Sequence, residues 1–339
     1  MTHIFSRILS VLRIMVFSSD IGRVASGRSQ LIWEEARRRG IEMEQVIFFG
    51  KPLEHYRAKI RGEWVYFQSI PIPPELVVHD YEARLDDKFI LAQELTKAGV
   101  PVPVSKTVFS FHGARKAFDS LTKPVIIKPR NGSRGRHTTT HIRTLHDLKA
   151  AYKLCRKIAA SMVIQEHFFG SVYRGTVVGG KLVGFFKADP PQVVGDGKTA
   201  IRELVVLKNK SRPEKLGDIQ LGDDALAFLA RQGLTPDSVL PAGTIVDLSA
   251  KTGRFYGGYT RELFEYVHPD FAAHFEKAAQ VMSAPVVGFD AIMEDPTKDP
   301  AAQKWGIIEG NSLPFIDLHY YAFEGKTRDL APFIWDLWR

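Results

Sequence analysis

Two apolar segments near the C-terminus each carry an acid where a buried strand is normally uncharged. Asp290 lies inside Val286–Met293, and Glu309 ends Lys304–Glu309. Because successive strand side chains alternate between faces, Glu309 and Asn311 reach one site together. Burying these acids unpaired would cost several kcal/mol, so a cation or another partner is required. Two carboxylates and an amide oxygen favour Mg²⁺ held between protein and phosphates, and a pair of solvent-facing strand-end acids is the alternative.

A lysine ends another apolar segment in the middle of the chain. Lys128 lies at the end of Pro124–Pro129, the glycine-containing loop Asn131–Arg136 follows at once, and Lys88 lies upstream. Small residues let backbone N–H groups approach phosphate oxygens, and lysine supplies a positive charge. The loop lacks the GxxxxGK[ST] pattern of a phosphate loop, so by itself it is more typical of a surface turn.

The charge balance limits the choice of ligand only weakly. The chain has 339 residues, with 46 Lys and Arg against 38 Asp and Glu and a net charge of +8. Such a surplus attracts nucleotides, carboxylated metabolites or nucleic acid. The sequence contains no dense basic block and no nucleic-acid-binding module, so we expect a small anionic ligand and no nucleic acid.

Cysteine and histidine usage gives no sign of a disulfide or a histidine metal site. The single cysteine, Cys155, lies in the helical pattern of Leu148–Ile158, and we expect a buried structural thiol. The eleven histidines show no metal-ligand spacing.

Residues 4–13 are amphipathic but interrupted by arginines, which indicates a short helix or lead-in strand and not a signal peptide. No apolar run approaches the roughly 20 residues that span a bilayer, so we expect a cytoplasmic protein without a membrane partner.

The pattern of apolar residues divides the chain into three predicted regions. Residues 1–85 contain a strand, a helix and a strand in that order, which predicts a small βαβ domain with a parallel sheet. Residues 86–168 open with a helix that begins at Asp86-Asp87-Lys88. Residues 169–339 are mixed α/β, with a hairpin that turns at Gly179-Gly180. One helix in this region is expected to bury a face made of Phe271, Phe275, Ala278, Ala279 and Met282.

The order of these features resembles the ATP-grasp family. A helix-initiating Asp-Lys precedes the strand lysine and its loop, an apolar strand ends in Gln165–Phe168, and the two acidic strands follow. The likeness runs from about Asp86 to the C-terminus. Three stretches carry it, namely Lys128–Arg136, Val193–Leu204 with Lys208-Asn209, and Leu229–Val239. Within the family they are most similar to the ATP-grasp portions of cyanophycin synthetase and of bifunctional glutathione-synthesising enzymes, and D-alanine–D-alanine ligase is a more distant relative.

The resemblance implies an α/β (α+β) ATP-grasp fold, in which two α+β subdomains clasp ATP. Here these are residues 86–168, with a phosphate lid, and residues 169–339, with a metal site. It implies an ATP-dependent carboxylate–amine ligase that uses one or two Mg²⁺ ions and forms an amide or peptide bond on an amino acid or small peptide. The expected route is an acyl phosphate, with release of ADP and phosphate.

The resemblance also implies the partners and leaves two alternatives. The partners are the small-molecule carboxylate and amine substrates, and a homodimer is expected because relatives are often homo-oligomers. A kinase- or carboxylase-type ATP-grasp enzyme is one alternative. A catalytically inactive nucleotide-binding partner protein is the other.

The same resemblance implies roles for individual residues. The expected nucleotide contacts are Lys88, Lys128, the lid residues Gly132, Ser133 and Gly135, and the adenine hinge of Gln165, Glu166, His167 and Phe168. The expected catalytic residues, which face phosphate or substrate, are Arg174, Lys187 and Arg254, although Arg254 is equally consistent with a surface position. The expected Mg²⁺ ligands are Asp290, Glu309 and Asn311, and Arg328 is expected to help shape the substrate pocket.

Three positions depart from the family pattern. Val172 stands where relatives often place an acid beside the ribose, and His137 replaces a glycine after the loop arginine. Lys251–Gly258 replaces an Asn-x-Ser-x-Gly-Gly stretch. The first two departures put the strength of ATP binding in doubt.

Overall fold

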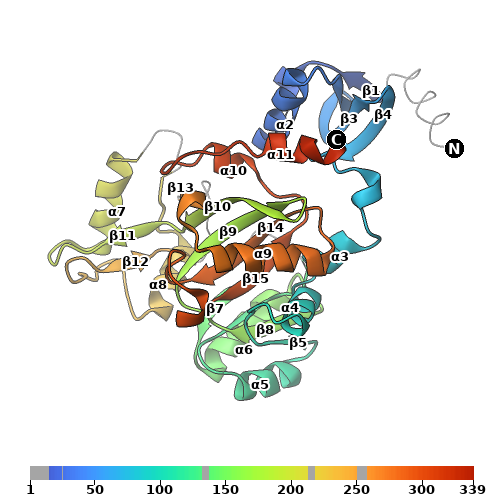
Figure 1. The fold of residues 1–339 in the computed structure, drawn as a ribbon. Coiled ribbons are helices and arrows are strands. Elements are labelled where there is room, and N and C mark those ends of the chain that lie inside the picture. Colours follow the sequence, from blue (N-terminus) through green and yellow to red (C-terminus); the bar gives the residue numbers. More distant parts are fainter. Residues whose placement is uncertain (1–14, 25, 132–136, 213–217, 250–257) are drawn as a thin grey trace.

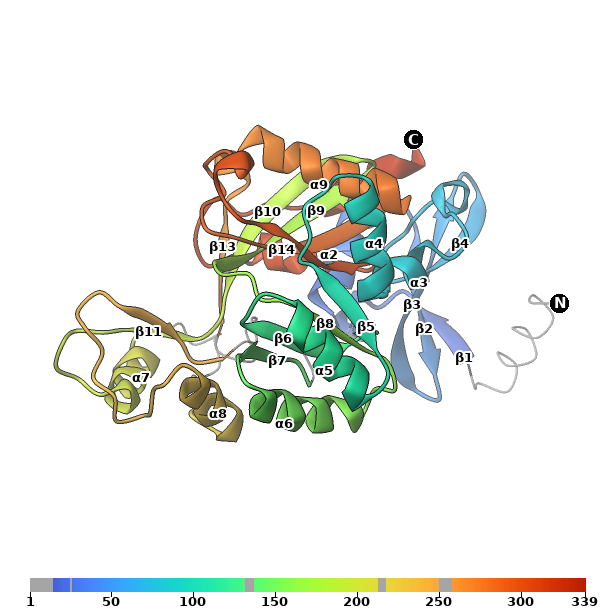
Figure 2. The same cartoon turned by 90° about the horizontal axis from the view of Figure 1, so that it is seen from below.

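The computed structural model describes residues 15–24, 26–131, 137–212, 218–249 and 258–339. The chain forms a small N-terminal domain, two larger α/β units stacked on one another, and a projecting insertion (Figures 1 and 2). The larger units each contain one antiparallel sheet.

The N-terminal sheet is antiparallel, so the predicted parallel βαβ unit is wrong. Its strands β1 (Met15–Ser18), β2 (Met43–Phe48), β3 (Lys51–Ile60) and β4 (Glu63–Gln68) pair in chain order. Helix α2 (Gly27–Arg38) packs against this sheet and shares its apolar core. Hydrophobic periodicity identifies strands but contains no information on their direction. Strand β3 was not predicted, because charged residues alternate with apolar ones in it.

The second sheet lies within residues 86–168. Its strands β5 (Ser105–Val108), β6 (Val125–Pro129), β7 (Thr139–Ile142) and β8 (Met162–Glu166) have the order β5-β8-β6-β7. Helices α5 (Phe111–Ser120) and α6 (Leu145–Arg156) cover one face and share its core. Cys155 lies in this core, and burial raises the pKa of its thiol to about 11. This confirms the predicted buried thiol.

The central sheet contains five antiparallel strands in the order β13-β10-β9-β14-β15. They are β9 (Ser171–Val178), β10 (Lys181–Asp189), β13 (Tyr259–Glu262), β14 (Val286–Met293) and β15 (Gly306–Asn311). The predicted turn between β9 and β10 is confirmed. Gly179 and Gly180 have φ values of 57° and 77°, as the mirror-image turns of tight hairpins require.

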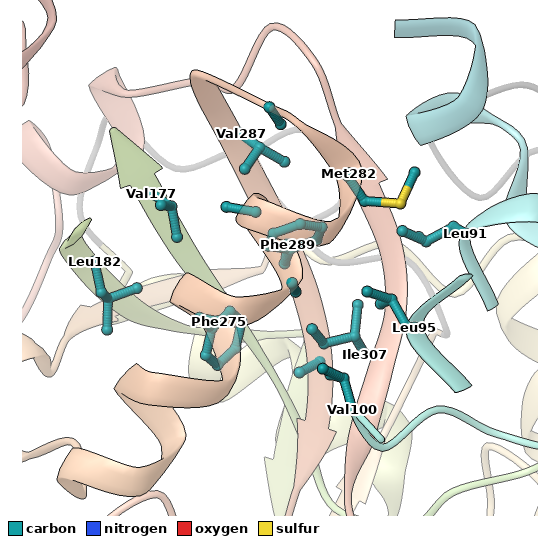
Figure 3. Close-up of a cluster of buried hydrophobic side chains, with 14 of the residues drawn as sticks. Leu91, Leu95, Val100, Val177, Leu182, Phe275, Met282, Val287, Phe289 and Ile307 are labelled. Carbon is teal, nitrogen blue, oxygen red and sulfur yellow. The ribbon is translucent and has the colours of Figure 1, made fainter. Parts of the chain in front are cut away.

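Helix α9 (Pro269–Met282) and helix α4 (Lys88–Lys97) cover one face of the central sheet. The five apolar residues predicted to face the core from α9 are all buried. Figure 3 shows Phe275 and Met282 of α9 and Leu91 and Leu95 of α4 in the same cluster as Phe289 of β14. Gly175 allows this close approach, because a Cβ there would lie 2.7 Å from the Phe275 ring.

The remaining chain forms an insertion and a C-terminal return. The insertion holds β11 (Gln192–Val194), α7 (Ile201–Lys210), α8 (Asp223–Arg231) and β12 (Ile245–Asp247), has its own small core, and projects from the body (Figures 1 and 2). Helix α3 (Tyr81–Asp86) follows the N-terminal sheet. After β15 the chain returns to the N-terminal domain through α10 (Asp317–Tyr320) and α11 (Ala331–Trp335). The Trp335 indole N–H donates to the Ile32 carbonyl at 2.9 Å, which ties α11 to α2. No helix among the described residues is long and apolar enough to span a membrane.

We expect Phe275→Ala to lower the free energy of unfolding by about 3–5 kcal/mol, because it opens a cavity under the central sheet. Phe109→Ala is the matched control, since Phe109 is 64% exposed whereas Phe275 is 0% exposed. Urea unfolding followed by tryptophan fluorescence measures both variants. Equal midpoints for the two variants would contradict the packing described here.

Candidate active site

Three charged side chains form a row across adjacent strands of the central sheet. Asp290 of β14 lies opposite Arg174 of β9 on one side and opposite Glu309 of β15 on the other. Residues that are paired in this way share a face of the sheet. Phe289 and Ala291, the neighbours of Asp290, point into the core beneath α9, so the charged row occupies the opposite face.

The Arg174–Asp290 pair is bidentate and mostly buried. Nε and Nη2 of Arg174 donate to the two Asp290 carboxylate oxygens at 2.7 Å and 2.8 Å. Each side chain is 15% exposed. Burial opposes the charge of Arg174, but the Asp290 carboxylate outweighs it and raises the pKa of Arg174 above its ordinary value. The ion pair explains why a carboxylate is tolerated at position 290 of an otherwise apolar strand, because Arg174 neutralises its charge.

Lys88 reaches the row from the first turn of α4. Asp87 caps this helix by accepting the backbone N–H groups of Phe89 and Ile90, which confirms the predicted helix start. The Asp87 carboxylate also accepts from Arg130 Nε at 2.7 Å. Lys88 Nζ then lies 3.5 Å from Glu309 Oε1. The cap therefore fixes the backbone position of Lys88, and the contact with Glu309 fixes the position of its ammonium group.

Lys128 comes to the same place from the second sheet. Its Nζ donates to the carbonyl oxygen of Ile308 at 3.2 Å. Burial lowers the pKa of Lys128 to about 8, and Lys88 adds to this effect while Glu309 and Asp290 oppose it. A buried ammonium group whose pKa is depressed lacks a strong anionic partner. A phosphate oxygen at this position would supply that partner.

The predicted metal ligands are brought together. Glu309 and Asp290 are cross-strand partners, and Asn311 lies opposite Gly288 one step along the same face. The Asn311 amide N–H donates to the Gly288 carbonyl at 3.3 Å. Among the described residues no group of three His, Cys, Asp or Glu could hold a metal ion. Two carboxylates and an amide suit Mg²⁺, which usually keeps waters and takes further oxygens from substrate phosphates.

The predicted adenine hinge joins the two sheets. Gln165 is 3% exposed and lies on the Lys128 face of the second sheet, since β8 pairs Gln165 with Ile126 and Val163 with Lys128. The Phe168 ring is buried against Gly306, where a Cβ would lie only 2.9 Å from it.

The other two hinge residues face different neighbours. Glu166 lies 3.5 Å from Lys304 Nζ. The His167 ring lies 4.2 Å from the His141 ring, and burial, followed by His141, lowers the pKa of His167 to about 4. His167 is therefore neutral near pH 7.

Lys187 is not brought to the charged row. A register shift between Leu182 and Gly184 places Lys187 opposite Tyr173, so it lies on the face opposite to Arg174. Its Nζ pairs with Asp189 at 2.9 Å. Without the bulge, strand alternation would have put Lys187 on the same face as Arg174.

Other predicted residues lie elsewhere. Arg328 donates to the Val183 carbonyl at 2.9 Å, and its guanidinium lies 3.8 Å from the centre of the Phe264 ring, so it supports the sheet edge. Four predicted site residues lie outside the described residues, namely Gly132, Ser133, Gly135 and Arg254.

Two further charged residues, which were not predicted from sequence, support this site. Arg130 orients the Asp87 cap, and its place directly after the Lys128 strand was a usable signal. Asp317 contributes, after Asp290 and Glu309, to the raised pKa of Arg174. Sequence pattern could not reveal Asp317, because only the path of the chain after β15 brings it near Arg174.

Comparison with known proteins places these observations in a family context. No protein-family model matches the chain. A cyanophycin synthetase from Crocosphaera subtropica is 31% identical over 252 residues, covering 72% of this chain and 29% of the synthetase. A glutathione biosynthesis bifunctional protein from Clostridium perfringens is 25% identical over 318 residues, covering 91% of this chain and 40% of that protein.

The structural comparison agrees with the sequence comparison. The crystal structure of a bifunctional glutathione synthetase from Pasteurella multocida superposes with a TM-score of 0.59 at 23% identity, over 92% of this chain and 44% of that chain. The chain spans less than half the length of each of these three proteins. The chain thus has the ATP-grasp fold and is related, over the segment they share, to cyanophycin synthetases and bifunctional glutathione-synthesising enzymes.

Proposed function

We propose that the chain is an ATP-dependent carboxylate–amine ligase that forms an amide bond on an amino acid or small peptide. The observation that carries this proposal is the meeting of Lys88 and Lys128 with the Arg174–Asp290–Glu309 row. Phosphoryl transfer depends mainly on positioning and on neutralising charge, and this cluster supplies three cations beside two carboxylates.

In the proposed first step an oxygen of the substrate carboxylate attacks the γ-phosphorus of ATP. The bond from that phosphorus to the bridging oxygen breaks, and ADP leaves. Lys128 and Lys88 hold the phosphate oxygens, and the depressed pKa of Lys128 rises as the phosphates supply its missing anionic partner. Bound Mg²⁺, one or two ions on Asp290, Glu309 and Asn311, would offset the charge of the phosphates.

In the proposed second step the amine nitrogen attacks the acyl carbon, and inorganic phosphate leaves. Arg174 is positioned by Asp290 and supports the oxyanion of the tetrahedral intermediate. We retain Arg254 and Lys187 as further candidates for phosphate or substrate contacts. Lys187 would have to turn from Asp189 and reach past the C-terminal end of β10, since β9 and β13 flank the strand on both sides there.

The nucleotide contacts complete the proposal. Gln165, Glu166, His167 and Phe168 line the adenine end, and Gly132, Ser133 and Gly135 contact the phosphates. We also propose that the enzyme acts in the cytoplasm as a homodimer, and the buried reduced Cys155 suits that compartment.

Product identification tests this function. Purified protein with Mg-ATP and pools of amino acids and dipeptides should release ADP and phosphate only when a particular carboxylate and a particular amine are both present. Chromatography separates the nucleotides, and mass spectrometry identifies the amide. AMP with pyrophosphate would instead demonstrate adenylation and would remove the acyl-phosphate route.

We expect Lys128→Gln to weaken ATP binding by about 10- to 100-fold, because one charge-assisted hydrogen bond is lost. The free energy of unfolding should not fall, since the substitution removes a buried charge that forms no ion pair with the described part of the chain. Lys149→Gln is the matched control, because Lys149 is exposed on α6. Isothermal titration of the three proteins with ATP and Mg²⁺ measures the difference, and equal affinities would remove Lys128 from the site.

We expect Glu309→Gln to raise the Mg²⁺ concentration needed for half-maximal ADP release by about tenfold, because one anionic ligand is lost. The amide oxygen of glutamine can still accept from Lys88, whose Nζ lies 3.5 Å from Glu309, so we expect the variant to keep its fold. Glu265→Gln, which breaks the exposed pair with Lys326, is the control. An unchanged Mg²⁺ requirement in the Glu309 variant would show that the metal binds elsewhere.

A further inference from the structure

Helix α8 of the insertion contacts the edge of the second sheet. Its Phe228 is only 4% exposed, yet it is not among the described residues that form the insertion's own apolar core, whereas Leu229 is. The Phe228 ring lies 5.7 Å from the His141 ring, edge to face at 83°. His141 belongs to β7, the edge strand of that sheet, and α8 lies beside β7 in both views (Figures 1 and 2). Phe228 therefore connects the insertion, which leaves and rejoins the central sheet, with the second sheet.

His141 also contacts the proposed adenine hinge. Its ring lies 4.2 Å from the His167 ring, and the His167 ring lies 4.9 Å from the Phe169 ring. The backbone of His141 has a φ of 58°, a left-handed conformation that a residue other than glycine keeps only where its surroundings enforce it. Nδ1 of His141 lies 3.0 Å from Oγ1 of Thr140. The His141 ring thus has a defined position between α8 and the hinge.

The two histidine rings are uncharged near pH 7. Burial, followed by Arg231 and Arg143, lowers the pKa of His141 below its ordinary value, and the pKa of His167 is lower still, at about 4. The guanidinium of Arg231, also on α8, lies 5.5 Å from the centre of the Phe228 ring. Neutral imidazole rings pack against aromatic rings without the cost of burying a charge. The rings of His141, His167, Phe169 and Phe228 therefore form one continuous contact.

This contact acts on a hinge whose backbone is already held on its other side. The His167 backbone N–H donates to the Pro124 carbonyl at 3.1 Å. The ring of the next residue, Phe168, is buried against Gly306 at the start of β15. The hinge is thus fixed to the central sheet through Phe168 and to the insertion through His167. A shift of the His167 ring would move the backbone groups on either side of it.

We propose that Phe228 is a positioning residue for the base of ATP. Through His141 and His167 it holds the hinge backbone at the place where N–H and carbonyl groups bind the edge of adenine. Phe228 itself does not touch the nucleotide. The role depends on the proposed nucleotide site, and it gives the insertion a part in recognising the base.

A comparison of ATP with ITP isolates this role. The two nucleotides differ only in the base, where hypoxanthine carries a carbonyl oxygen in place of the amino group of adenine. Competition against a fluorescent ATP analogue, with Mg²⁺ present, measures the Kd of each nucleotide for the wild-type protein and for Phe228→Ala. We expect the Kd for ATP to rise about threefold to tenfold, the size of one lost aromatic contact, and the Kd for ITP to rise by less than about twofold.

Two further variants separate positioning from folding. Leu226→Ala, at a 38% exposed position of α8, is the matched control and should change neither Kd. His141→Asn removes the second ring, and asparagine tolerates the left-handed backbone there, so this variant should lose preference for ATP as Phe228→Ala does. Because the two rings act in series, the double variant should lose no more than the larger of the two single losses. His141 lies outside the insertion, so its variant decides the test if Phe228→Ala does not fold.

The possible results have different meanings. A reduced preference for ATP over ITP in both ring variants, with unchanged circular dichroism, supports the proposal. Equal rises in both Kd values, or no change in either, would overturn it, because Phe228 would then serve the fold or nothing in the site. Equal binding of ATP and ITP by the wild-type protein would overturn it as well, because the hinge would not read the base. Binding of neither nucleotide by the wild-type protein would instead reject the nucleotide site, and with it the proposed ligase function.

Discussion

The ion pair between Arg174 and Asp290 is the interaction on which the candidate site depends. Two mostly buried charges on adjacent strands neutralise each other through two hydrogen bonds. Removing either partner would leave the other charge buried and unpaired, which would lower the free energy of unfolding by about 3–5 kcal/mol. The register that pairs them also sets Glu309 beside Asp290. A slip of one residue would turn these groups into the core beneath α9 and bring Phe289 to the open face. The packing of the core and the chemistry of the site therefore require the same alignment of β9, β14 and β15.

The site is completed only where the two sheets meet. Lys128 belongs to the second sheet but contacts the backbone of β15, and Lys88 starts a helix that packs on the central sheet. The Asp87 cap and Arg130 connect these two lysines, because Arg130 follows the Lys128 strand and binds the cap of the Lys88 helix. A change in the distance between the sheets would move Lys128 away from Glu309. Nucleotide binding between the sheets and the relative position of the two subdomains are thus expected to be coupled.

Much of this arrangement follows from local sequence, and the remainder depends on register and tertiary contacts. The apolar face of α9, the Asp87 helix start and the Gly179-Gly180 turn are encoded within a few residues each, and the structure confirms them. The direction of β1 against β2 is not encoded locally, so the parallel prediction was wrong. The orientation of Lys187 depends on a bulge at Leu182 and Gly184 that no spacing rule reveals. Asp317 acts on the charge of Arg174 only through the path that the chain takes after β15, which local sequence does not reveal.

The most direct test of the account is a crystal structure of the protein with Mg²⁺ and a non-hydrolysable ATP analogue. We predict that the triphosphate lies between the two sheets, with Lys88 and Lys128 on its oxygens and the metal bound by Asp290 and Glu309. We also predict that adenine lies beside Gln165–Phe168. A nucleotide bound on the α9 face of the central sheet, or a metal that contacts neither Asp290 nor Glu309, would contradict it.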